Sequence, residues 1–274
     1  MSQYNFKCSA SNNNPYKINI LMDKYIDLTT KSAFIQLNTI YFPNNFINNY
    51  NHNYFTCYFK KGSVNEVKRV IPIPQSMYSL ESCLKTILIC AEESFADKSS
   101  KFNLDFEITN TKEGFSCFYI NPAIDSSHAD YLLEFNGSES IGDLIGYKNY
   151  TMPPYSGVFP ITKIYKHYQN IPCDQNFITS PIFVKIDTNI NVSTNANRKN
   201  QEPVAKENIV YMFNSAVSPP FSMLEKDILT DARIQILDTE IKNLSIEFLD
   251  QNFQSLRPLD DSALSSIDYS IYIE

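Results

Sequence analysis

Residues of the types that act in catalysis occur in this chain, but none of them belongs to a known catalytic motif. Its 3 histidines are His52, His128 and His167, and no two of them are spaced as a helical metal-binding pair. The glycine patterns that cradle phosphates and the turn that presents a catalytic serine are also missing. We therefore expect no enzyme activity and no catalytic, cofactor-binding or metal site.

Carboxylate pairs could act as general acid and base, as they do in glycosidases built on β-sandwiches. Glu92–Glu93 and Asp260–Asp261 are adjacent pairs, and Glu247 shortly precedes Asp250. Such pairs are common in an acidic protein, so we favour solvated surface charge as their interpretation. A β-sandwich hydrolase would need one pair to face a single cleft.

The cysteines are not spaced as metal ligands. All 6 lie outside CxxC or zinc-like patterns, and the first residues contain no apolar core of a signal peptide. We expect reduced, mostly buried thiols in a protein made inside the cell. These residues are Cys8, Cys57, Cys83, Cys90, Cys117 and Cys173.

The charge of the chain argues against a direct role with nucleic acid. Acidic residues outnumber basic ones by 30 to 23, which gives a net charge of −7. The densest basic runs are only KK at 60–61 and RK at 198–199. A phosphate-binding surface needs clustered cations, so we expect no nucleic-acid partner.

The segment YFPNNFINNYNHNYFTCYF (41–59) is rich in aromatic residues. Its rings could form a surface on which sugars stack, which would make the chain a carbohydrate- or receptor-binding β-sandwich module. They could also be strand aromatics on either side of a loop, and we favour this interpretation. Measurements of glycan binding and of oligomeric state would separate the two.

A surface helix is predicted at 79–94 within MYSLESCLKTILICAEESF. Leu84 and Leu88 belong to an apolar stripe at helical spacing, and Ser79 can cap the first turn. The charges of Lys85 and Glu92 exclude a membrane span and place those side chains in solvent. The helix should therefore lie on an apolar surface and stabilise the fold.

Alternating apolar residues predict strands in most of the remaining chain. The clearest alternation is at 182–192, 241–249 and 267–273, and the last two of these strands should pair with each other in antiparallel fashion. A short helix is expected at 140–145, with Ser140 as its cap and Gly146 at its end. Further strands are predicted at 17–22, 33–42, 53–60, 66–74, 102–109, 114–120, 130–135 and 208–216. Many short strands and few helices indicate an antiparallel sandwich.

Four short motifs occur in an informative order: RVIPIPQSMYSLESCLKTI, SESIGDLIGY, SPIFVKIDTNI and the C-terminal pattern from KNLSIEFLD to IDYSIYIE. This order, over 66–274, resembles that of the minor capsid (penton) proteins of virophages and Polinton-like viruses. Two departures stand out. Tyr147 occupies a position where the family pattern leads us to expect Phe, and the turn DQN (250–252) is not followed by the Gly of a D-x-x-G pattern.

The resemblance implies an all-β, antiparallel jelly-roll sandwich with one longer helix. In this interpretation 1–15 is a flexible N-terminal arm and 16–274 a single jelly-roll domain with a candidate insertion around 76–150. Homopentamers would stand at the five-fold vertices of a virion assembled inside the host cell, beside the major capsid protein. Loops near 41–59 and 147–159 would contact neighbouring copies, and 193–208 would stay exposed.

Overall fold

The computed structural model of the chain consists of two compact units. Unit 1 comprises Met1–Ile47 and Thr179–Glu274, and unit 2 comprises Asn48–Ile178. The residues that the structure describes are 2–11, 14–49, 51–61, 64–98, 102–110, 115–121, 130–153, 164–188, 209–215, 222–228, 234–236, 240–259 and 264–274.

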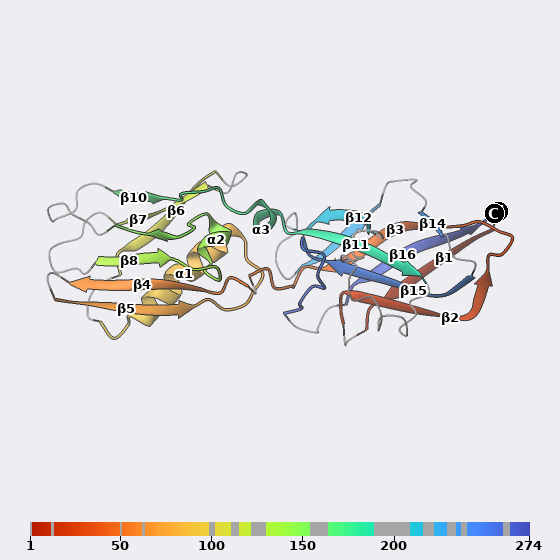
Figure 1. Cartoon of the computed structure of the whole chain (residues 1–274), viewed down its shortest axis with the longest axis horizontal. Helices are drawn as coiled ribbons and strands as arrows, with labels where there is room; N and C mark the ends of the chain where they lie inside the picture. Colours follow the sequence, from red (N-terminus) through yellow and green to blue (C-terminus); the bar gives the residue numbers. More distant parts are fainter. Residues whose placement is uncertain are drawn as a thin grey trace, which may run out of the picture. The chain divides into compact units, whose positions relative to one another are not determined.

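Unit 1 is a sandwich of two antiparallel sheets (Figure 1). In order across the first sheet lie β1 (Ser2–Ser9), β16 (Ser266–Ile273) and β3 (Ala33–Pro43), and both β13 (Met223–Asp227) and β14 (Ile234–Ile236) pair with the far edge of β3. In order across the second lie β12 (Ile209–Asn214), β11 (Pro181–Thr188), β15 (Glu240–Leu249) and β2 (Lys17–Asp27).

The order of these strands is that of a jelly roll. Strands β1, β16, β3 and β13 form one sheet, and β2, β15, β11 and β12 form the other, so the chain changes sheet repeatedly as it proceeds. The predicted all-β jelly-roll class is therefore confirmed. The predicted pairing of the last two strands is wrong, because β15 pairs with β11 and β2 while β16 pairs with β1 and β3.

The alternating apolar residues of unit 1 meet between its sheets. Phe42 of β3 lies 5.4 Å from Phe248 of β15 and 5.2 Å from Phe213 of β12, measured between ring centroids. Along β11, Ile182, Val184 and Ile186 are buried as the alternation predicts, although 189–192 lie outside the described residues. Large aromatic side chains thus fill the space that two facing sheets leave.

Unit 2 occurs in the sequence between β3 and β11, and it contains two further antiparallel sheets. One has β10 (Tyr165–Tyr168), β7 (Phe115–Ile120) and β6 (Leu104–Asn110); the other has β5 (Val64–Pro72), β4 (Tyr54–Lys61), β8 (Asp130–Phe135) and β9 (Tyr150–Thr151). Helices α1 (Leu80–Ser94), α2 (Gly142–Ile145) and α3 (Gln175–Thr179) complete the set of helices in the described residues.

Helix α1 forms where it was predicted and contacts β5 and β6 (Figure 1). Ser79 is its N-cap, and the side chains and backbone of Ser79 and Ser82 bond reciprocally in a capping box. Leu84 is buried and Leu88 is half-buried, whereas Lys85 and Glu92 are exposed. No described helix has the length and apolar character that a bilayer crossing requires.

The boundaries differ from those expected in three places. Residues 2–9, expected as part of a flexible arm, form β1 because β16 offers an unpaired edge to their backbone. The second unit begins at 48 and ends at 178, beyond the expected insertion around 76–150. The short helix ends at Gly146 as predicted, with φ of 86°, but its N-cap is Ile141 and not Ser140.

Candidate functional site

The two described histidines, His52 and His167, lie in different surroundings. The Nδ1 atom of His52 is 3.2 Å from the carbonyl oxygen of Ser140. His167 lies on β10, is buried, and has a pKa below its usual value because burial disfavours the charged ring. His128 lies outside the described residues, and within those residues no group of His, Cys, Asp or Glu could hold a metal ion.

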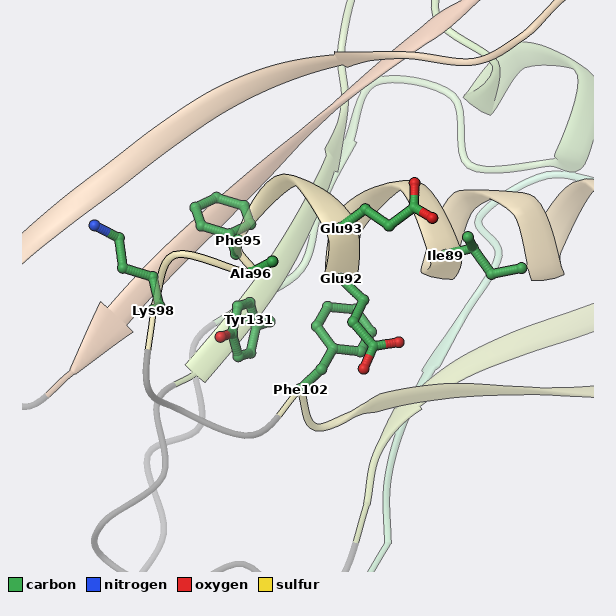
Figure 2. Close-up of a pocket in the computed structure, with 8 residues that line it drawn as sticks. All are labelled: Ile89, Glu92, Glu93, Phe95, Ala96, Lys98, Phe102 and Tyr131. Atoms are coloured by element: carbon green, nitrogen blue, oxygen red, sulfur yellow. The ribbon is translucent and has the colours of Figure 1, made fainter.

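The carboxylates that could form an acid–base pair are found in separate surroundings. Glu92 and Glu93 are exposed on α1, and Figure 2 shows their side chains extending in different directions. Glu247 accepts a hydrogen bond from the Ser255 hydroxyl group, while Asp250 accepts backbone N–H groups within its own turn. Asp260 and Asp261 lie outside the described residues.

The cysteines match the expectation of mostly buried thiols. Cys57, Cys83, Cys117 and Cys173 are buried, and Cys8 and Cys90 are half-buried. Burial raises the pKa of Cys57 and of Cys173 to about 12, so these thiols stay protonated at neutral pH. A protonated thiol is a poor nucleophile, so these side chains act as small apolar residues in the cores.

The rings of segment 41–59 are largely inside the two units. Phe42 and Phe46 belong to the core of unit 1, and Phe55 and Phe59 to the core of unit 2. Phe42, Phe55 and Phe59 are strand aromatics, as the favoured interpretation expects, while Phe46 lies in the connection between β3 and β4. These four buried rings do not form a stacking surface for sugars. Tyr50 lies outside the described residues.

A polar hollow occurs in the connections of unit 2. Its volume is about 360 Å³, and it is lined by Asn51, His52, Asn53, Ser138 and Glu139. The backbone N–H of Asn53 donates to the carbonyl of Glu139 at 3.1 Å, which joins the segment before β4 to the segment after β8. Amide, hydroxyl and carboxylate groups at this spacing could exchange hydrogen bonds with a polar ligand.

A second hollow, the helix-end hollow, occurs where α1 ends (Figure 2). Its volume is about 340 Å³, and its lining includes Glu92, Glu93, Phe95, Phe102 and Tyr131. It combines carboxylates with aromatic rings, which is a different chemistry from that of the polar hollow. Neither hollow was predicted, because the polar hollow joins two segments that are distant in the sequence and the helix-end hollow needs Tyr131 of β8 beside residues 89–102.

Unit 1 presents apolar side chains at both open sides of its sandwich. The β1–β2 flank consists of Tyr4, Leu21 and Tyr25, whose exposed fractions are 49%, 84% and 62%. The β12–β13 flank consists of Met212 and Met223, which are 58% and 51% exposed. Strands β1 and β2 contact each other at one edge of the two sheets, so β12 and β13 mark the opposite edges.

The β1–β2 flank also has an irregular backbone edge. Leu21 pairs with Asn243 and Ile26 pairs with Ile241, so residues 22–25 of β2 stand opposite Lys242 alone. Such a bulge interrupts the ladder and turns backbone groups of an edge strand away from their partner. Edge strands with exposed apolar residues are places where another chain can dock.

This fold places the chain in the class of jelly-roll proteins that carry a second β-rich unit between the third and fourth strands of the roll. No protein-family model and no curated protein matches the chain. Among solved structures, the crystal structure of the mavirus penton protein is similar over 99% of this chain and 98% of that chain, with a TM-score of 0.52 at 10% identity. A chain of the Sputnik virophage structure matches over 98% and 97%, with a TM-score of 0.41 at 11% identity. The resemblance seen in the sequence is thus confirmed as a penton-like fold.

Proposed function

We propose that this chain is a structural minor capsid (penton) protein, which forms homopentamers at the five-fold vertices of an icosahedral virion. The observation that carries the proposal is the fold, which the chain shares with the mavirus penton protein over nearly its whole length. In this role it is not an enzyme, and it binds neither a cofactor nor nucleic acid. Its partners are other copies of itself and the major capsid protein, in virions assembled inside the host cell.

The two apolar flanks of unit 1 are consistent with a closed ring of five copies. In a closed ring each protomer uses two different surfaces, one toward each neighbour. The β1–β2 flank and the β12–β13 flank lie on opposite sides of the sandwich, as such a contact requires. These strand edges replace the segment 41–59 as the proposed contact, because several of its aromatic rings are buried within the protomer.

Reconstruction of purified particles by electron microscopy tests the proposal. We expect this chain in five copies around each five-fold axis, bordered by a different and larger capsid protein. Quantitative mass spectrometry of the same particles should find it at a vertex-like ratio to the major capsid protein. Its absence from virions, or a position away from the five-fold axes, would refute the penton role.

A carbohydrate- or receptor-binding module is the second candidate, and the polar hollow is the observation that favours it. Asn51, His52 and Glu139 offer hydrogen-bonding groups to sugar hydroxyls. A glycan array probed with the whole chain distinguishes the candidates. Two results together would favour the binding module over the penton. The chain would bind a glycan and lose this binding in Glu139→Gln, and the chain would be absent from purified virions.

A further inference from the structure

The lining of the helix-end hollow carries more negative than positive charge, because it contains Glu92 and Glu93 but only one basic residue, Lys98. Helix α1 carries Glu92 and Glu93 in its last turn and no basic residue there. Cations are the favoured side chains at this end of a helix, because the carbonyl groups there are partly negative. Placing carboxylates in this turn therefore works against the stability of the helix.

The described cations nearby are already engaged by another acid. Arg69 and Lys98 pair with Asp97 at 3.1 Å and 3.2 Å, and Arg69 also donates to the carbonyl of Ser94. Glu92 and Glu93 form no ion pair within the part of the chain that the structure describes. Because both side chains are exposed, their carboxylates are accessible to a cationic group of another molecule.

Aromatic rings form the body of the hollow. Phe102 and Tyr131 lie 4.9 Å apart and Phe95 and Tyr131 lie 5.7 Å apart, measured between ring centroids. These contacts hold the rings in place, and Phe102 is only half-buried. An aromatic face next to a carboxylate attracts a cation that is also flat and weakly hydrated.

The lining of the hollow also contains aliphatic side chains. Ile89, which is 44% exposed, and the exposed Ala96 belong to its lining, and Figure 2 shows Ile89 one turn before Glu93 on α1. One small cation would leave this surface uncovered. An occupant that brings apolar atoms along with its charge fits better, and a side chain attached to an extended segment has both.

From these observations we propose that the helix-end hollow binds an arginine side chain of a partner protein. The guanidinium group would pair with Glu92 and stack on Phe102, and the methylene groups and flanking residues would cover Ile89 and Ala96. Arginine fits better than lysine because its planar group can meet a carboxylate edge and a ring face together. The site lies within unit 2 and does not rest on the proposed capsid role.

The test is an NMR titration of the isotope-labelled full chain with the peptide acetyl-Ala-Arg-Ala-amide. The same peptide with citrulline has nearly the same shape without the charge, and acetyl-Ala-Lys-Ala-amide keeps the charge without the plane. We expect the arginine peptide to shift the ring signals of Phe102 and Tyr131 saturably. The citrulline and lysine peptides should bind more weakly.

Two charge-matched variants complete the test. Glu92→Gln should lower the affinity for the arginine peptide about fivefold, which corresponds to the loss of one partly exposed ion pair. Glu81→Gln, at the exposed first turn of the same helix, removes an equal charge and should leave the affinity unchanged. Unchanged spectra of the free variants would show that both fold. The proposal is overturned if the ring signals do not respond, if citrulline or lysine binds as tightly, or if Glu81→Gln weakens binding as much as Glu92→Gln.

Discussion

Tyr147 joins β7 to β10 through a single buried hydroxyl group. The group donates toward the carbonyls of His167 at 3.0 Å and Ser116 at 3.2 Å, and it accepts the backbone N–H of Phe118 at 3.2 Å. Tyr147→Phe keeps the ring but removes these bonds, so we expect the free energy of unfolding to fall by about 1–3 kcal/mol. Chemical denaturation measures the change, and exposed Tyr168→Phe on β10 is the control that should have almost no effect.

His167 should make the stability of the protein depend on pH. Burial lowers the pKa of this ring in the folded state, so the unfolded chain binds the proton more readily. The stability is therefore complete above the unfolded pKa of about 6.5 and decreases as the pH falls below it, by at most about 1.4 kcal/mol per pH unit. Melting temperatures between mildly acidic and neutral pH should fall less in His167→Gln than in the wild type. An equal fall in both would assign the effect to other groups.

Two individual residues show what the sequence could not reveal. The resemblance led us to expect Phe at 147, yet the fold uses the hydroxyl of Tyr147 to satisfy backbone groups that are remote in sequence. The turn after β15 lacks the expected Gly, and Phe253 stands there instead with φ of 58°, a conformation that a bulky residue rarely adopts. Phe253 packs against Phe183 of β11, with 4.9 Å between the ring centroids, and this contact offsets the strain.

At the level of elements, Leu84 anchors α1 to unit 2. Its side chain is fully buried in the cluster that includes Ile87 and Phe118, so Leu84→Ala should lower the free energy of unfolding by about 2–5 kcal/mol. The adjacent Lys85→Ala is the control, because Lys85 is exposed and alanine suits a helix. Thermal or chemical denaturation checks both variants. Equal stability of Leu84→Ala and the wild type would mean that the helix contributes little to the fold.

The elements that could be predicted are those whose own residues specify them. Strands β11, β15 and β16 alternate clearly, and α1 has both a cap and an apolar stripe, so each was found within a few residues. Strand β1 is mostly exposed, and its conformation depends on the edge of β16 more than on its own pattern. The pairing of β15 and β16 was wrong because alternation identifies a buried face but not the sheet to which a strand belongs.

At the level of the whole molecule, the proposed penton role makes the two flanks of unit 1 the contacts between copies. Leu21→Glu places a charge on the β1–β2 flank, and Met212→Glu places one on the β12–β13 flank. Both side chains are exposed, so neither change should alter the melting temperature by much. Each should nevertheless abolish incorporation at vertices, which particle composition measures. Val70→Glu, an exposed apolar position in unit 2, is the matched control and should assemble normally.

A mixture of the two flank variants distinguishes a head-to-tail ring from a symmetric dimer. If each protomer presents one flank to one neighbour and the other flank to the next, the intact flank of Leu21→Glu can meet the intact flank of Met212→Glu. That contact leaves only altered flanks at the outer sides, so assembly should stop at dimers. Native mass spectrometry under conditions in which the wild type forms closed rings would detect this. Larger rings from the mixture, or dimers from either variant alone, would contradict a head-to-tail contact between the β1–β2 flank and the β12–β13 flank.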